Sequence, residues 1–252
     1  MNYKQLLLKG RKYKMNIKYF QCINSDEIGL KVSKLFVEQV KRNPNSVFIL
    51  ATGSSPLSTY KAICNDYELN KTNWSKAITF NLDEYLALKT NYNDQSYRYF
   101  MNTNLFDHIN VDKNNTHFPS QDLLGDKYQQ LIYSHHQVDI AILGVGNNGH
   151  IAFNEPGTPL NSMTHVVDLT ESSRQANARF FDNDINNVPT QAITMGLKEI
   201  LSARKIILIA TGKSKKAAID KLQSAASFDS KWPITALTQH NNVLVYIDGL
   251  DK

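Results

Sequence analysis

The sequence predicts an α/β fold with a single doubly wound, mostly parallel sheet and helices on both faces, a Rossmann-like arrangement of three layers. Apolar runs of strand length recur along the chain, and several are continuous rather than alternating, as in strands covered on both faces. Segments with helical periodicity separate these runs, and this alternation is typical of α/β folds. The 252 residues contain no internal repeat, low-complexity tract or Pro/Gly/Ser-rich linker that would favour another organisation.

The predicted strands are short apolar runs, and they cover residues 17–22, 47–51, 77–81, 138–145, 205–210 and 243–247. Ser25 or Asp26 can cap the first predicted helix, which ends before Pro44. Ser55 and Pro56 open the second, because proline is well placed at a first helical position. Further helices are predicted over residues 121–134, 171–181 and 214–225.

We predict one domain over residues 15–252, preceded by a tail over residues 1–14. Met15 stands directly before a clear strand pattern, and Gly10-Arg11 upstream can be encoded by a purine-rich ribosome-binding sequence. The tail is therefore either a disordered N-terminus, which is common at chain ends, or a leader that is not translated in the cell.

Composition excludes several classes of protein. Hydrophobic residues make up 42% and charged residues 20%, which is ordinary for a globular domain and too hydrophobic for a disordered chain. The net charge of +5 is spread along the chain, so we expect no nucleic-acid partner. No apolar run approaches a membrane span, and the two cysteines suggest reduced thiols. We therefore expect a cytoplasmic protein that does not bind a membrane.

The first candidate site is the loop Thr52-Gly53-Ser54-Ser55, which joins a predicted strand to a predicted helix. Free backbone N–H groups and the positive end of the helix dipole meet in such a loop, which suits a phosphate. The glycine spacing and the lysine of a Walker loop are missing. An ordinary turn with a capping serine would have a similar sequence.

The second candidate is the pair Asp83-Glu84 at the carboxyl end of a buried strand, where open α/β sheets bind ligands. A partly buried carboxylate there can act as a general base. Neighbouring side chains on a strand diverge, so only one of the two should face a cleft. The other interpretation is a solvated acidic turn.

The most specific candidate follows the strand predicted at 138–145. Three glycines between residues 144 and 149 indicate a tight loop, and His150 and Glu155 come directly after it. Histidine titrates near neutral pH and serves as an acid or a base when a carboxylate holds its tautomer. Two basic residues, Arg179 and Lys215, lie near helix starts and can hold a phosphate.

Three motifs together resemble the glucosamine-6-phosphate deaminase family over about residues 15–248. They are Phe80-Asn81-Leu82-Asp83-Glu84-Tyr85 with Gln95-Ser96-Tyr97, Gly149-His150-Ile151-Ala152-Phe153-Asn154-Glu155-Pro156, and Asn177-Ala178-Arg179-Phe180-Phe181. The resemblance implies conversion of D-glucosamine 6-phosphate and water into D-fructose 6-phosphate and ammonia, without a metal or an organic cofactor.

The resemblance also implies roles for single residues. Asp83 matches the base that moves a proton between C2 and C1, His150 matches the residue that opens the sugar ring, and Glu155 matches its orienting partner. The matches to the phosphate pocket are Thr52, Gly53, Ser54, Ser55, Arg179 and Lys215.

Two departures from the family pattern are informative. Many members have an aspartate two residues before the histidine, where this chain has Asn148. An amide can hold the imidazole by a hydrogen bond, but it stabilises an imidazolium less. Hexameric, allosterically activated members have basic residues where this chain has His165 and Val167, and they extend beyond its last residue. We therefore expect a monomer or a small homo-oligomer that N-acetylglucosamine 6-phosphate does not activate.

Three other functions are alternatives to the one that the resemblance implies. A 6-phosphogluconolactonase usually has an arginine after the Asp-Glu pair, where this chain has Tyr85, and lacks the Phe153-Asn154-Glu155 run. An enzyme for galactosamine 6-phosphate is harder to separate, because one hydroxyl distinguishes the two substrates. The presence of Asp83, His150 and Glu155 together argues against a sugar-phosphate sensor without activity.

Overall fold

The computed structural model describes residues 16–135 and 137–251. The tail predicted over residues 1–14, and the boundary predicted at Met15, lie outside the described residues. Within the described residues, the fold class predicted from the sequence is confirmed.

The main sheet has seven strands in the order β1-β10-β9-β6-β2-β3-β5, and all of its pairs are parallel. Each predicted strand run overlaps one of them, and β9 and β10 each extend one residue beyond the predicted end. The strands are β1 (Ile17–Gln21), β2 (Val47–Leu50), β3 (Ile78–Asn81), β5 (Thr116–His117), β6 (Ile140–Leu143), β9 (Lys205–Thr211) and β10 (Val243–Asp248). The two-residue edge strand β5 is the one that the apolar pattern does not predict, because it is too short.

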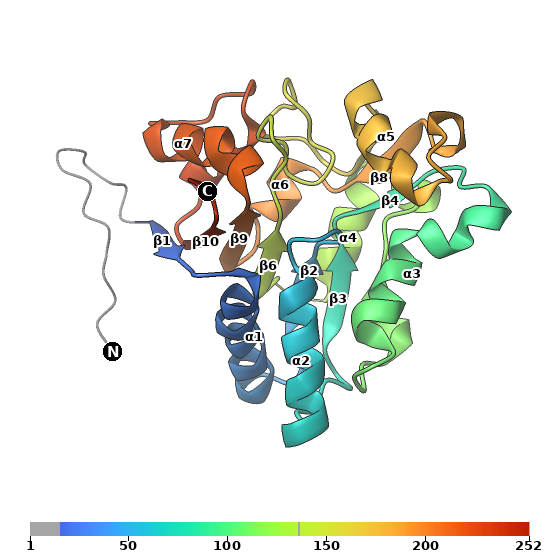
Figure 1. The fold of residues 1–252 in the computed structure, drawn as a ribbon. Helices are drawn as coiled ribbons and strands as arrows, with labels where there is room; N and C mark the ends of the chain where they lie inside the picture. The colour runs from blue at the N-terminus through green and yellow to red at the C-terminus, as the bar shows by residue number, and fades with distance from the viewer. Residues whose placement is uncertain (1–15, 136, 252) are drawn as a thin grey trace.

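Helices cover both faces of this sheet (Figure 1). They are α1 (Ser25–Arg42), α2 (Leu57–Asn70), α3 (Tyr97–Met101), α4 (Asp126–Ser134), α5 (Glu171–Asn177), α6 (Leu197–Ile200) and α7 (Lys216–Ser224). A π-turn covers Asn102–Phe106. Short 3-10 turns cover Thr90–Gln95, Lys113–Asn115, Gln121–Leu123, Ala178–Phe180, Ile185–Asn187, Lys213–Lys215 and Pro233–Gln239.

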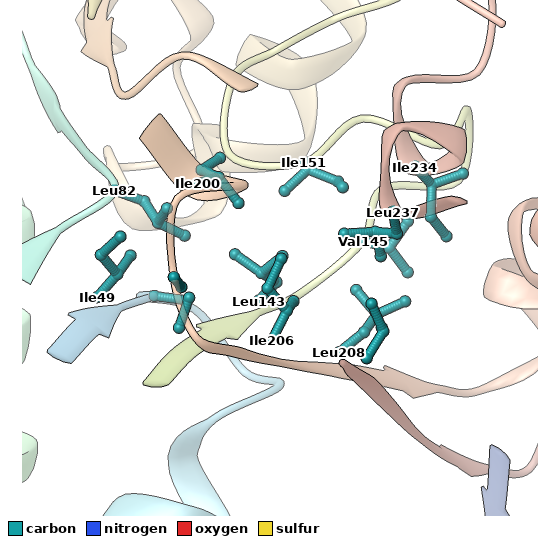
Figure 2. Packing of buried hydrophobic residues seen from close by; sticks show 14 of the residues in the cluster. Ile49, Leu82, Leu143, Val145, Ile151, Ile200, Ile206, Leu208, Ile234 and Leu237 are labelled. Atoms are coloured by element: carbon teal, nitrogen blue, oxygen red, sulfur yellow. The ribbon is translucent and has the colours of Figure 1, made fainter. Parts of the chain in front are cut away.

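Successive residues of the central strands face opposite cores. Phe48 and Leu50 of β2 pack with α1, α2 and α3, whereas Ile49 packs with α4 and α7. Figure 2 shows this second core, where Ile49, Leu143 and Ile206 lie under residues of the loops above the sheet. Because both faces are buried, the strands read as continuous apolar runs.

Three predicted helix starts are corrected by the structure. Asn24, rather than Ser25 or Asp26, caps α1, because its backbone is extended and its side chain accepts the N–H of Glu27 at 2.9 Å. The second helix begins at Leu57, with Pro56 as its capping residue. The helix predicted from residue 214 is a 3-10 turn until α7 begins at Lys216.

Two other predicted helices are interrupted. Gly125, with a φ of 67°, separates the 3-10 turn Gln121–Leu123 from α4. The helix predicted to reach residue 181 ends as α5 at Asn177 and continues as a 3-10 turn. Helical periodicity in a sequence predicts which face of such a segment is apolar. It does not predict a change from an α-helix to a 3-10 turn, because the apolar residues stay on the same face over one turn.

A second, three-stranded antiparallel sheet has the order β4-β8-β7 and was not predicted. It consists of β4 (Asp83–Tyr85), β8 (Gln191–Thr194) and β7 (His165–Asp168). Its strands are three or four residues long and partly polar, so they lack a recognisable pattern. Together with α5 it lies beyond the carboxyl ends of the main strands, at the upper right of Figure 1.

The order of the main sheet reverses between β2 and β6. The chain adds β3 and β5 on one side of β2 and then returns to add β6, β9 and β10 on the other side. The loops after β2 and β6 therefore diverge and leave a crevice at the carboxyl edge, which is where open α/β sheets bind ligands.

Candidate active site

A cleft of about 620 Å³ lies at this reversal point. Its walls come from the loops after β2 and β6, from β4 and α3, and from the segment after α5. Eight of the ten predicted site residues line it: Thr52, Gly53, Ser54, Ser55, Asp83, His150, Arg179 and Lys215. The other two, Asn148 and Glu155, are not among the lining residues. Residues that are up to 163 positions apart (52 to 215) thus share one cavity.

The loop after β2 presents donors to one end of the cleft. Within the described chain, none of the backbone N–H groups of residues 52–55 donates to another backbone carbonyl outside regular structure. Gly53 has a φ of 84°, a left-handed conformation that favours glycine. The loop leads into the 14-residue helix α2, whose positive dipole end faces the same space. This end of the cleft therefore suits an anion.

Two cations also line the cleft. Lys215 lines the cleft, and its Nζ donates to Oδ1 of Asn147 at 2.9 Å. Partial burial lowers the pKa of Lys215. The guanidinium of Arg179 lies 4.6 Å from the ring centroid of Phe180, and both residues are exposed at the cleft mouth.

Asp83 is the buried carboxyl of the cleft. The residue is 7% exposed, and burial, followed by the neighbouring charge of Glu84, raises the pKa of Asp83 to about 8. A carboxyl with a pKa near neutral can both accept and return a proton, which an ordinary aspartate does poorly. The fold places it as the first residue of β4, directly after the turn that leaves β3.

Glu84 has a structural task instead. Its carboxylate accepts backbone N–H groups of Tyr85, Tyr97 and Arg98, each at 2.9 Å, and so holds the start of α3. Burial raises the pKa of Glu84 despite these hydrogen bonds. Of the two adjacent carboxyls, only Asp83 lines the cleft, in agreement with the divergence predicted from the sequence.

His150 lines the same cleft, with a carboxylate beside it. Its Nδ1 lies 3.5 Å from Oε1 of Glu155, and both side chains are largely covered. Burial tends to raise the pKa of Glu155, but contacts with His150, Asn148 and Ser173 together lower it. An ionised Glu155 favours the tautomer of His150 that carries hydrogen on Nδ1.

Asn148 does not hold the imidazole as predicted. Its Nδ2 donates to Oε2 of Glu155 at 2.7 Å, and its Oδ1 accepts the backbone N–H of His150 at 3.2 Å. Asn148 therefore orients Glu155 and the backbone of His150, and acts on the ring only through them.

Gly146 makes room for the imidazole. A Cβ at this position would lie 2.1 Å from Cε1 of His150, so any larger residue would displace the ring. The loop is closed by the backbone N–H of Gly146, which donates to the carbonyl of His150 at 2.9 Å. Close packing against the histidine thus explains the glycine at position 146.

Sequence reasoning missed an aromatic and amide wall of the cleft. Tyr85 and Tyr97 have ring centroids 4.8 Å apart, and Nδ2 of Asn177 donates to the hydroxyl of Tyr85 at 2.9 Å. Burial raises the pKa of Tyr85 to about 12, so its hydroxyl stays neutral. Tyr97, Phe100 and Met101 show helical spacing in the sequence, but nothing local indicates that this short helix borders a site.

Within residues 16–135 and 137–251, no three His, Cys, Asp or Glu side chains gather into a group that could hold a metal ion. In the same residues, no helix combines the length and the apolar character needed to cross a membrane.

Comparison with known proteins agrees with this site. The family model of glucosamine-6-phosphate isomerases and 6-phosphogluconolactonases matches residues 25–246. The chain is 47% identical to the glucosamine-6-phosphate deaminase of Malacoplasma penetrans, over 93% of this chain and 99% of that protein. It is 44% identical to the enzyme of the same name from Mycoplasma mycoides, over 89% and 92% of the two chains.

Solved structures resemble the fold as well. A monomeric glucosamine-6-phosphate deaminase superposes with a TM-score of 0.86 at 37% identity, covering 92% of this chain and 98% of that one. A 6-phosphogluconolactonase from Thermotoga maritima has a TM-score of 0.70 at 19% identity, covering 92% and 99%, which shows a shared fold alone. The chain thus belongs to the family of glucosamine-6-phosphate isomerases and 6-phosphogluconolactonases, and its relatives at 37–47% identity are deaminases.

Proposed function

We propose that this protein is an enzyme that converts D-glucosamine 6-phosphate and water into D-fructose 6-phosphate and ammonia. The observation that carries the proposal is a single cleft that contains an anion-binding end, a buried carboxyl with a raised pKa and a histidine backed by a carboxylate. The similarity to deaminases over nearly the whole chain supports the same reaction.

The phosphate binds at the end formed by Thr52, Gly53, Ser54 and Ser55, with Arg179 and Lys215 as its cations. Backbone N–H groups and the α2 dipole contribute partial positive charge, and the two side chains contribute full charges. Binding energy from this non-reacting group is available to orient the sugar. In this proposal the phosphate places C1 and C2 beside Asp83.

His150 opens the pyranose ring. The imidazolium gives a proton to the ring oxygen as the bond between C1 and that oxygen breaks, and the imidazole takes the proton of the C1 hydroxyl, which becomes the aldehyde. Glu155 stabilises the imidazolium before the first transfer and after the second, and Asn148 keeps Glu155 in place.

Asp83 then moves the proton that isomerises the sugar. Its carboxylate removes the proton from C2, the electron pair forms the C1–C2 double bond, and the aldehyde oxygen takes up a proton to give an enolamine. The protonated carboxyl returns the proton to C1, and C2 becomes an iminium carbon. Water adds to C2 and ammonia leaves, which gives fructose 6-phosphate. A pKa of about 8 suits a group that must both take and return a proton.

We further propose that the protein acts as a monomer in the cytoplasm. The 37% identical deaminase of known structure is monomeric, and this chain covers 98% of it. A sugar phosphate is a dianion that does not cross a bilayer unaided, so the substrate occurs where it is made. The partner in this proposal is a small molecule, the sugar phosphate.

The test is the release of ammonia and fructose 6-phosphate from purified protein. Glucosamine 6-phosphate should yield both products in equal amounts, with galactosamine 6-phosphate and 6-phosphogluconolactone as parallel substrates. A higher kcat/KM for the galacto epimer would reassign the substrate. Hydrolysis of the lactone alone would contradict the proposed reaction.

A further inference from the structure

The end of strand β8 is tied to both catalytic segments. Thr194 is fully buried and pairs with Asp83 across the antiparallel β4–β8 ladder. The next residue, Met195, donates its backbone N–H to the carbonyl of Leu82 at 2.6 Å. The segment that carries Asp83 is therefore held by the end of β8 and by the residue that follows it.

The same two residues hold the histidine loop. The hydroxyl of Thr194 accepts the backbone N–H of Phe153 at 3.1 Å, and Nδ2 of Asn154 donates to the carbonyl of Met195 at 2.8 Å. Phe153 and Asn154 lie between His150 and Glu155 in the chain. Thr194 thus lies opposite Asp83 in the ladder and holds the segment of His150 and Glu155 through its side chain.

The chain directly after Thr194 and Met195 is itself held by hydrogen bonds to a buried carboxylate. The carboxylate of Glu199, a fully buried residue, accepts the N–H of Gly196 at 2.7 Å and the hydroxyl of Thr164 at 2.8 Å. These bonds join the residue that follows the Thr194–Met195 pair to the start of β7. The strand end is consequently fixed on the side away from the cleft.

We propose that Thr194 is a positioning residue that sets the separation between Asp83 and the His150–Glu155 pair. The inference rests on the proposed function. In that reaction Asp83 must reach C2 and C1 of the sugar, while His150 must reach the ring oxygen of the same molecule. Both must lie within about 3–3.5 Å of their atoms, and a displacement of about 1 Å can cost 100-fold in rate. Thr194 is not among the residues that line the cleft, so it acts through the segments that it joins.

The phosphate end depends on other segments. Residues 52–55 follow β2, Arg179 follows α5, and Lys215 precedes α7. Loss of the Thr194 hydroxyl should therefore impair the chemical step more than substrate capture.

The test compares Thr194→Val with Thr194→Ser. Valine keeps the shape but cannot accept the N–H of Phe153, whereas serine keeps the hydroxyl. Thr194→Val should lower kcat about 10- to 100-fold while KM changes less than about two-fold. Thr194→Ser should recover most of kcat. The matched control is Thr238→Val, another buried threonine whose hydroxyl bonds a backbone carbonyl, that of Thr235 at 2.8 Å.

Rates are measured well below each variant's Tm and divided by the folded fraction from circular dichroism. A kcat of Thr194→Val within two-fold of wild type, or the same kcat loss in Thr238→Val, would overturn the positioning role. If Thr194→Val does not fold, Asn154→Leu removes the second tie and should show the same split between kcat and KM. An inactive wild-type protein would instead refute the proposed function, so the two failures are distinguishable.

Discussion

At the scale of single residues, burial decides which of two adjacent carboxyls can serve catalysis. Asp83 and Glu84 are chemically alike, but Glu84 is used by three backbone N–H groups at the start of α3. Asp83 keeps its carboxyl at the cleft, where burial raises its pKa to about 8. The divergence of neighbouring side chains on a strand predicted that one of the two carboxyls would face the cleft. The family resemblance predicted that this carboxyl would be Asp83.

Asp83→Asn should lower kcat about 100- to 10,000-fold, the usual contribution of general acid–base catalysis, because an amide cannot accept the C2 proton. The measurement is product release by folded protein, with Glu84→Gln as the comparison. Turnover close to wild type in Asp83→Asn would remove Asp83 from the mechanism.

The same substitution should change stability with pH. The folded-state pKa of Asp83 is raised to about 8 from an ordinary value of about 3.9, so folding favours the protonated carboxyl. The stability that Asp83 contributes is full below about pH 4 and is lost as pH rises through about 8. Asparagine does not ionise, so the Tm of Asp83→Asn relative to wild type should be higher at pH 8.5 than at pH 5.5. An equal Tm difference at both pH values would contradict the burial argument.

Arg179→Ala and Lys215→Ala should each raise KM about 10- to 100-fold. Each removes a charge-assisted contact to the phosphate, worth about 1.5–3 kcal/mol. Initial rates over a range of glucosamine 6-phosphate concentrations measure the effect, and Lys213→Ala on the same 3-10 turn is a nearby control. Unchanged saturation in both variants would place the phosphate elsewhere.

At the scale of elements, the glycine-rich loop after β6 is shaped by what packs against it. Gly146 lies under the imidazole of His150, and Gly149 adopts a φ of 82°. The sequence indicated a tight loop with close backbone approach. It did not indicate that the approaching group is the histidine of the same motif, because that contact depends on how the loop folds back.

Gly146→Ala should displace the His150 ring, since the new Cβ would lie 2.1 Å from Cε1. We expect kcat to fall about 10- to 100-fold with a smaller effect on KM. The matched comparison is Gly144→Ala in the same loop, where the nearest atom would be the Ser55 hydroxyl at 3.3 Å, and its kcat loss should be milder. Equal kcat in Gly146→Ala and wild type would show that the loop accommodates the methyl group without moving the ring.

At the scale of the whole molecule, we expect a monomer with hyperbolic kinetics that N-acetylglucosamine 6-phosphate does not alter. Allostery needs a second site whose ligand distinguishes two global states. At the positions where regulated relatives are expected to be basic, Val167 cannot donate a hydrogen bond, and Nδ1 of His165 already lies 2.7 Å from the carbonyl of Met163.

Sedimentation velocity and initial-rate curves with and without the acetylated sugar phosphate test this expectation. A single species near the mass of one chain and superimposable hyperbolic curves are the expected results. A sigmoidal curve that the effector makes hyperbolic would show that other residues rebuild a regulatory site.

The sequence by itself determined the fold class, the main strands except β5 and most of the site. Buried parallel strands are continuous apolar runs, so their pattern is local and visible. Asp83, His150 and the phosphate-binding candidates other than Arg179 stand near strand ends and helix starts, and these positions converge in any doubly wound sheet. Their chemical types and spacing also carry the family resemblance.

Only the tertiary structure decided which groups meet. The small sheet β4-β8-β7 is built from strands of three or four residues, and β4 pairs with β8 more than 100 residues away. The bond from Asn148 to Glu155, the wall of Tyr85 and Asn177, and the junction at Thr194 all join segments whose relative placement no local pattern encodes. The pKa of Asp83 is likewise a product of burial, which exists only once these segments have packed together.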